Sequence, residues 1–167
     1  KIMFFYKLSG YRMSADEAYL IIRGLRTLDT RLNQHYQSTM QVIQFLKKQK
    51  KIIEILYPHK SSSKNYKLWK KYYTGATGLF SIVIKSKNKS SVIKFVNSLD
   101  LFGIGYSWGG FESLAILQEL RASKDEYSQG RRFFRFGKDE HIVRLHIGLE
   151  DPKDLINDLK KSLRYIK

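Results

Sequence analysis

The sequence contains no cysteine and no long apolar run. Without cysteine, the chain can form no disulfide and offers no thiolate as nucleophile or metal ligand, which is typical of proteins in reducing compartments. No stretch approaches the roughly 18 apolar residues of a membrane-spanning helix. The apolar start, KIMFFYKL (residues 1–8), is too short for a signal peptide, and no small-residue cleavage site follows it. We therefore expect a cytoplasmic protein with no membrane partner.

Acidic residues are scarce: 15 Asp and Glu stand against 31 Lys and Arg, giving a net charge of +16. Such a charge makes nucleic acid a candidate partner. However, the cations are mostly lysines in short, scattered runs at 47–51, 64–71 and 85–89, and no RNA-binding signature of basic and alternating aromatic residues is present. A solvated lysine-rich surface is the preferred interpretation. A stand-alone basic binding module for nucleic acid or an acidic partner is the alternative.

The hydrophobic content, by contrast, is ample: 43% of the 167 residues are apolar and 14% are aromatic, enough for one globular domain. A long helical region is predicted from Ser14 to Lys48. Ser14 and Glu17 form a capping-box pattern at its start, and a break is expected near residues 23–28.

Strands and helices alternate irregularly in the rest of the chain. Such an order predicts an α+β fold, in which a long N-terminal helical segment leads into a small, mostly antiparallel sheet covered by helices. Residues 111–120 are expected to form a loop or a helix, and residues 121–140 follow no clear pattern. The predicted strands cover residues 50–57, 79–85, 103–107 and 143–147, and the predicted helices cover residues 66–73, 89–99 and 152–163.

The strand at 143–147 places an arginine on an unusual face. Because strand side chains alternate, Val143, Leu145 and Ile147 form an apolar face, while Arg144 and His146 point the other way. A guanidinium is a planar fork that fits a carboxylate. It serves a structural ion pair equally well, so both roles stay open. Carboxylates for such a pair are at Glu112, Glu150 and Asp151, the last of which is also the predicted N-cap of the following helix.

Ser107 and Trp108 precede two glycines, and glycines let a backbone approach a ligand closely. A hydroxyl and a backbone amide at Ser107 could assist Arg144 in holding a carboxylate, with Trp108 as a pocket wall. Gly105 to Gly109 also matches the G-x-S-x-G elbow of serine hydrolases, followed by Asp139, His141 and His146. Too few strands precede it for that fold, so a hydrolase is not favoured.

Two other patterns favour ordinary surface roles. Lys64 follows three serines, as some Schiff-base lysines follow hydroxyl residues, but it lies in a polar loop, and a solvated lysine is preferred. The four histidines show no metal-ligand spacing. No metal site is predicted.

Four segments nevertheless resemble one enzyme family, in order and in register. The sequence is similar to the C-terminal part of the Cys/Met-metabolism pyridoxal-phosphate enzymes (fold type I, the trans-sulfuration family). Trp108 and the segment RLHIGLED look most like those of the bacterial cystathionine β-lyases. The segments are RGLRTLDTRLNQH (23–35), TGATGLFSIVIK (74–85), YSWGGFESL (106–114) and RLHIGLEDPKDLINDL (144–159).

The resemblance implies that Arg144 binds the α-carboxylate of an amino-acid substrate, with Ser107 and Trp108 beside it. The family reaction is β-elimination of cystathionine to homocysteine, pyruvate and ammonia, with pyridoxal phosphate as electron sink. The family is homo-oligomeric, so self-association is expected.

The Schiff-base lysine of the family, in a Ser-x-Thr-Lys-Tyr context, is absent from these residues. The resemblance therefore implies a truncated or split protein with no catalytic residue of its own. Such a chain would be inactive alone, would not bind pyridoxal phosphate by itself, and would depend on a separate chain carrying the cofactor domain. In this division, residues 1–13 are a remnant of the connection to that domain, 14–50 an interdomain helix region, and 51–167 the C-terminal small domain.

Overall fold

The structure is a computed structural model that describes residues 1–10, 12–59, 61–118, 136–137 and 139–167. Three helices come first in the chain, and strands and helices then alternate irregularly. The described elements are α1 (Ile2–Ser9), α2 (Ala15–Arg26), α3 (Leu28–Leu46), β1 (Ile52–Leu56), α4 (Tyr66–Tyr72), β2 (Leu79–Lys85), α5 (Lys89–Asn97), β3 (Gly103–Ile104), β4 (Leu114–Gln118), β5 (Glu140–His146), α6 (Pro152–Ser162) and a short 3-10 helix (Leu163–Tyr165).

The sheet has the strand order β1-β2-β5-β4-β3, with β5 in the centre. Neighbouring strands are antiparallel except for β3 and β4, which are parallel. In the central register, Leu145 of β5 lies opposite Phe80 of β2 on one side and Ala115 of β4 on the other. The predicted α+β class, with a small and mostly antiparallel sheet, is confirmed.

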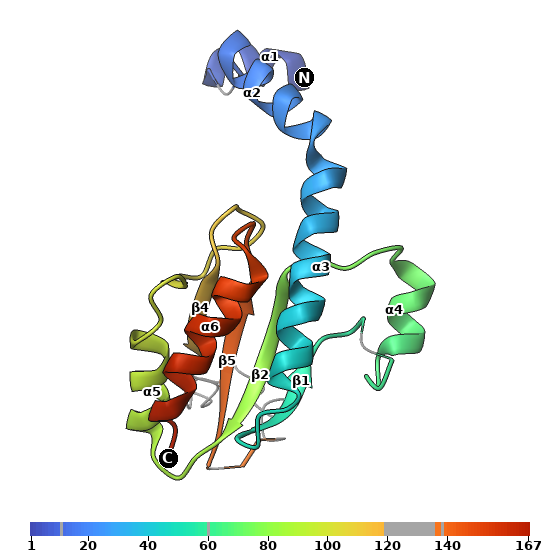
Figure 1. Ribbon diagram of the computed structural model, residues 1–167. Helices are drawn as coiled ribbons and strands as arrows, with labels where there is room; N and C mark the ends of the chain where they lie inside the picture. The colour runs from blue at the N-terminus through green and yellow to red at the C-terminus, as the bar shows by residue number, and fades with distance from the viewer. Residues whose placement is uncertain (11, 60, 119–135, 138) are drawn as a thin grey trace, which may run out of the picture.

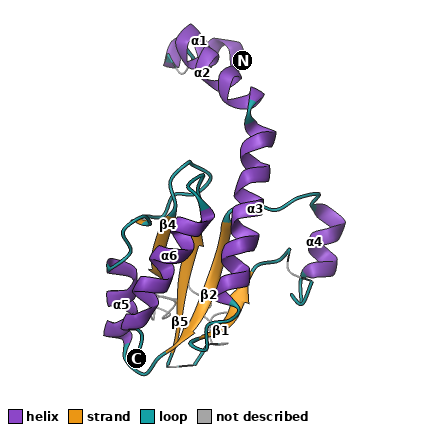
Figure 2. Cartoon of the chain, viewed as in Figure 1, coloured by secondary structure: helices purple, strands orange, loops and turns teal. Residues whose placement is uncertain are grey.

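Helices α3, α5 and α6 cover one face of this sheet (Figures 1 and 2). The predicted alternation in β5 explains why, because Val143, Leu145 and Ile147 are all fully buried towards these helices. Helix α6 begins as predicted, with the Asp151 side chain accepting a hydrogen bond from the Lys153 amide at 2.8 Å. Its Leu155 is fully buried against the sheet. This packing fixes the position of β5, and therefore of Arg144.

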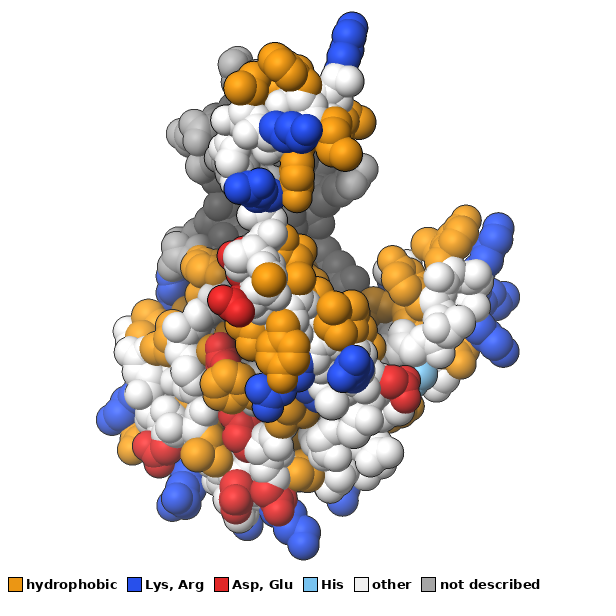
Figure 3. Space-filling model, turned by 90° about the horizontal axis from the view of Figure 1, so that it is seen from above, with side chains coloured by type: hydrophobic (Ala, Val, Ile, Leu, Met, Phe, Trp, Pro, Cys, Tyr) orange, Lys and Arg blue, Asp and Glu red, His pale blue; other side chains and the backbone are white. Residues whose placement is uncertain are grey.

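The N-terminal arm, formed by α1 and α2, projects from the far end of α3 and away from the sheet (Figure 1). The capping box predicted at Ser14 and Glu17 is present, and the expected break lies at Thr27 between α2 and α3. No residue of α1 or α2 is buried. Hydrophobic side chains therefore gather on the surface of the arm (Figure 3). No helix in the described ranges is long and apolar enough to cross a membrane.

Two sequence predictions near β3 and β4 were wrong. Residues 114–118 form strand β4 rather than a loop or helix, and the strand predicted over 103–107 covers only Gly103 and Ile104. Residues 114–118 (LAILQ) include good helix formers, so local propensity does not favour a strand. Pairing with β5 overrides that propensity, and Ala115 is buried at its centre. The division of the chain at residues 13 and 50 stays a prediction.

Candidate functional site

Arg144 lies in the middle of β5, opposite Ser81 of β2 and Ile116 of β4, on the sheet face that points away from the helices. Its side chain is half-buried. The Nη2 atom donates to the carbonyl oxygens of three successive residues, Gly105 at 3.3 Å, Tyr106, and Ser107 at 3.4 Å. The guanidinium carbon also lies 5.8 Å from the centre of the Tyr106 ring. Arg144 therefore holds the loop that follows β3.

The described partners of Arg144 are carbonyl groups and not carboxylates. Among the described contacts, Arg144 therefore forms no ion pair with Glu112, Glu150 or Asp151. All three hydrogen bonds come from Nη2, so Nε and Nη1 have no hydrogen-bond partner within the described part of the chain. A guanidinium has five N–H donors in a fixed fork. While Nη2 holds the loop, Nε or Nη1 can still donate a hydrogen bond to a carboxylate oxygen.

Ser107 and Trp108, the other two predicted site residues, lie in the same loop that Arg144 holds. The structure thus brings the three residues into one region, although they come from positions far apart in the sequence. Both side chains are exposed, and Trp108 retains 64% of its accessible surface. Trp108 therefore presents its ring at the surface, where it can form the wall of a pocket.

The turn that follows β5 fastens the rest of this loop through hydrogen bonds that the sequence did not predict. The backbone N–H of Leu149 donates to the Phe111 carbonyl at 2.8 Å. The carboxylate of Glu150 accepts from both the backbone N–H and the hydroxyl of Ser113, each at 2.8 Å. Ser113 is fully buried, and its hydroxyl also accepts from the Gly148 amide at 2.8 Å. These contacts connect the loop to the rigid centre of the sheet.

The serine-hydrolase pattern does not assemble. His146 Nε2 lies 3.1 Å from the Gly109 amide nitrogen and 3.2 Å from the Gly110 oxygen, so its ring faces the backbone and not the Ser107 hydroxyl. Asp139 lies just before the opposite end of β5, about 23 Å away at about 3.3 Å per residue. Ser107, His146 and Asp139 therefore do not form a catalytic triad, and the other candidate, His141, binds the Ser86 carbonyl at 3.0 Å.

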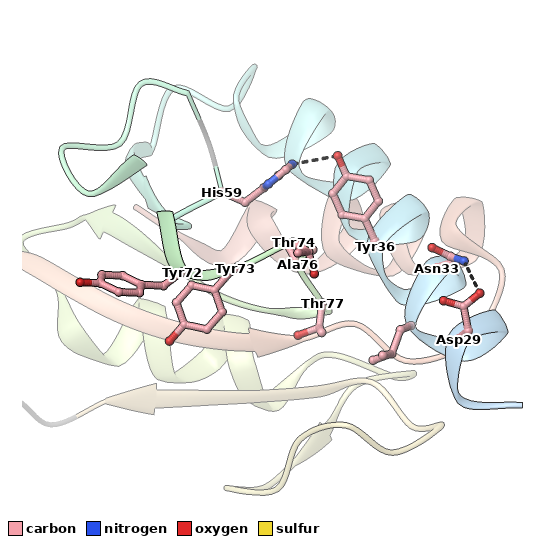
Figure 4. A pocket seen from close by; sticks show the side chains of 11 residues that line it. Asp29, Asn33, Tyr36, His59, Tyr72, Tyr73, Thr74, Ala76 and Thr77 are labelled. Atoms are coloured by element: carbon pink, nitrogen blue, oxygen red, sulfur yellow. Dashed lines mark hydrogen bonds between the residues drawn. The ribbon is translucent and has the colours of Figure 1, made fainter. Parts of the chain in front are cut away.

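A hollow of about 650 Å³ lies elsewhere on the molecule, between α3 and the segment at 72–77 (Figure 4). Tyr36 and His59 meet on one side of it, with the Tyr36 hydroxyl 2.9 Å from His59 Nε2. Asn33 and Asp29 lie along α3 and share a hydrogen bond of 3.2 Å. None of the predicted site residues lines this hollow.

Comparison with known proteins identifies the wider group. Residues 1–164 match the family described as Cys/Met metabolism PLP-dependent enzyme. The chain belongs to this family. It is 39% identical to the cystathionine beta-lyase of Escherichia coli over 153 residues, which are 91% of this chain and 38% of that protein. It is 37% identical to an L-alanine/L-glutamate racemase of Wolbachia pipientis over 95% of this chain and 38% of that protein.

A solved structure has the same fold. It is described as an O-acetylhomoserine (thiol)-lyase of Campylobacter jejuni, and it carries a pyridoxyl-lysine group. The TM-score is 0.73 at 28% identity, covering 97% of this chain and 35% of that one. The chain thus spans little more than a third of the length of the relatives it matches.

The described residues do not fit the family cofactor. A lysine that forms a Schiff base must be partly desolvated to lose its proton near neutral pH. Lys64, the one candidate from the sequence, is exposed in the loop before α4, and no described lysine is buried. The described part of the chain also contains no cluster of three metal-ligating side chains. The described lysines are therefore not suited to form a Schiff base with pyridoxal phosphate.

Proposed function

We propose that this chain provides the substrate-carboxylate-binding part of a cystathionine β-lyase-like enzyme. In this proposal Arg144 receives the α-carboxylate of an amino-acid substrate. Ser107 and Trp108 line the site from the loop that Arg144 already holds. The reaction served is the pyridoxal-phosphate-dependent β-elimination of cystathionine. The cytoplasmic location expected from the sequence is part of the same proposal.

One observation carries the assignment of Arg144. Its Nη2 is engaged by three backbone carbonyls, whereas Nε and Nη1 have no described partner, on a sheet face that the helices leave uncovered. A cation placed in this way is already oriented, so less side-chain entropy is lost when a carboxylate binds. The nearby Trp108 supplies an exposed aromatic surface for the substrate side chain.

The chemistry itself is assigned to residues outside these 167. Because no described lysine is buried, we expect the isolated chain neither to hold pyridoxal phosphate covalently nor to cleave cystathionine. A second polypeptide segment, on a separate chain or in the same protein, must then supply the cofactor-binding lysine. The N-terminal arm is a suitable surface for that segment or for a second copy of the chain, since Ile2, Phe5 and Leu25 are 88%, 68% and 61% exposed.

A chimera tests the proposal. This chain replaces the matching residues of the Escherichia coli cystathionine beta-lyase, and cystathionine cleavage is assayed together with alanine racemisation. We expect cleavage, with kcat/KM lowered at least 30-fold in Arg144→Met, because removing one partner of a desolvated charge pair costs about 2–5 kcal/mol. Arg164→Met is the matched control, because Arg164 is exposed on the 3-10 helix at Leu163–Tyr165. Racemisation without cleavage would contradict the lyase assignment, and equal kcat/KM values for the two variants would contradict the role of Arg144.

Two measurements on the chain alone complete the test. Adding pyridoxal phosphate should give no lysine-linked visible absorbance and no turnover, and a lyase activity of this chain alone would refute the division of labour. Sedimentation should reveal self-association through the exposed arm. A monomer that binds no hydrophobic dye would contradict that part of the proposal.

A further inference from the structure

Two histidines are buried where α3 meets the end of β5. His35 and His146 are each only 2% exposed, and their ring centres lie 5.3 Å apart at an interplanar angle of 44°. His35 Nδ1 donates to the Ile147 carbonyl at 2.7 Å, which ties α3 to the residue directly after β5. His35 is thereby fully explained as a structural link. His146 is not, because its polar contacts conflict.

The conflict lies at His146 Nε2, which is within hydrogen-bond distance of one backbone donor and one backbone acceptor. The Gly109 amide, at 3.1 Å, needs Nε2 to accept, whereas the Gly110 carbonyl, at 3.2 Å, needs Nε2 to donate. A single nitrogen in a neutral ring satisfies only one of them at a time. Nδ1 is buried without any hydrogen-bond partner among the described residues. The imidazole therefore has no arrangement in which all of its neighbours are satisfied.

The groups around the ring shift the pKa of His146 in both directions. Burial lowers the pKa of His146 below its usual value, the Gly110 carbonyl raises it, and the neighbouring His35 lowers it further. Glu150, in the turn after β5, and Glu112, in the loop, both raise the pKa. The neutral ring is thus the stable form at neutral pH, and acid is required to protonate it.

Protonation changes which backbone group His146 can hold. In the neutral ring, Nε2 can accept from the Gly109 amide. In the protonated ring, both nitrogens carry hydrogen, so Nε2 can only donate to the Gly110 carbonyl and the Gly109 amide loses its acceptor. Gly109 has a φ of 83°, a left-handed conformation that only glycine adopts without strain. The contact therefore acts directly on the peptide that follows Trp108.

We propose that His146 is a positioning residue for the Ser107–Gly110 loop, which its neutral imidazole holds through the Gly109 amide and releases on protonation. The position of Trp108, and of the carbonyls that Arg144 holds, then depends on the protonation state of His146. The significance for substrate binding rests on the proposed function of Arg144, whereas the loop contact does not. Low pH would loosen the substrate side of the site without altering Arg144 itself.

Gly78 supports the same geometry from the other side of the ring. A Cβ atom on Gly78 would lie 3.1 Å from both Nδ1 and Cε1 of His146 and would clash with the Ile147 oxygen. The ring therefore occupies space that exists only because residue 78 has no side chain. Gly78→Ala should displace His146 or the Ile147 carbonyl, and it provides a second way to disturb the loop without changing the imidazole.

The test follows the Gly109 amide in the intact chain by NMR after ¹⁵N-glycine labelling, since the chain has 11 glycines. Between about pH 8 and about pH 4.5, the wild-type Gly109 proton signal should move upfield, with a midpoint below about 6.5, the ordinary histidine value. His146→Gln should abolish this transition, because its amide cannot titrate. His141→Gln is the matched control and should preserve the transition, because His141 binds the Ser86 carbonyl at the opposite end of β5.

Hydrogen exchange at neutral pH provides the second readout. His146→Leu and Gly78→Ala should each lower the protection of the Gly109 amide at least tenfold, whereas His146→Gln should retain part of it. A Gly109 signal that stays constant over the whole pH range would overturn the proposal. Persistence of the transition in His146→Gln would do the same. Neither readout requires cofactor or substrate, so failure here is distinguishable from failure of the carboxylate site.

Discussion

The Ser113 hydroxyl is the most informative single group to remove, because it joins three parts of the candidate site. It donates to the Glu150 carboxylate and accepts from the Gly148 amide, both at 2.8 Å, in a residue with no exposed surface. Ser113→Ala removes both hydrogen bonds and leaves the Gly148 N–H without its acceptor. Only the bond from the Ser113 backbone amide to Glu150 remains. The turn after β5 would then hold the loop more weakly.

The size of the loss follows from these contacts. A hydrogen bond to a charged group contributes about 1.5–3 kcal/mol, and an unsatisfied buried amide costs about 1–3 kcal/mol. The two effects overlap because they share one hydroxyl, so we expect Ser113→Ala to lower the free energy of unfolding by about 3 kcal/mol. With an m-value of about 2 kcal/mol per molar urea, the unfolding midpoint should fall by about 1.5 M.

Urea unfolding followed by circular dichroism measures this loss. Ser61→Ala is the matched control, since Ser61 is exposed in the loop after β1 and should change the midpoint by less than about 0.3 M. Hydrogen exchange should also show faster exchange of the Gly148 amide in Ser113→Ala alone. A loss below about 0.5 kcal/mol, or unchanged protection of Gly148, would refute the idea that the hydroxyl fastens the loop.

Two further predictions concern other buried polar groups. Asp158 is 4% exposed and accepts from the backbone amides of Asp100 and Leu101 at 2.8–3.1 Å. Asp158→Ala should therefore cost about 2–4 kcal/mol of unfolding free energy and Asp158→Asn clearly less, and equal urea midpoints for the two would contradict this. Burial raises the pKa of Tyr57, and Tyr36 adds to the effect, while the Tyr57 hydroxyl donates to the Thr77 carbonyl at 2.9 Å. Because the folded-state pKa lies above the unfolded value of about 10, this stabilisation is present below that pH and is lost as pH rises. Tyr57→Phe should lower stability by about 1 kcal/mol at pH 7 and flatten the alkaline fall in melting temperature, and parallel curves for the two proteins would exclude this explanation.

Local sequence patterns determined those helices and strands whose ends and buried faces depend on residues close together in the chain. The alternation of Val143, Leu145 and Ile147 predicted a strand with an apolar face in the core, and Asp151 followed by Pro152 predicted the start of α6. The Ser14 capping box and the break at Thr27 were predictable for the same reason. In each case the interacting groups lie within a few residues of one another, so their spacing alone encodes the structure.

The tertiary structure alone decided how the candidate site is supported. Strand β4 exists because it pairs with β5, although its sequence has helical propensity. His35 reaches the Ile147 carbonyl across 112 positions of sequence, and Ser113 reaches Glu150 across 37. Contacts between such distant residues leave no periodicity in either segment, because only the closed sheet brings them together. The sequence therefore led to the hypothesis that Arg144 binds a carboxylate, while the fold revealed the contacts that hold the loop beside Arg144.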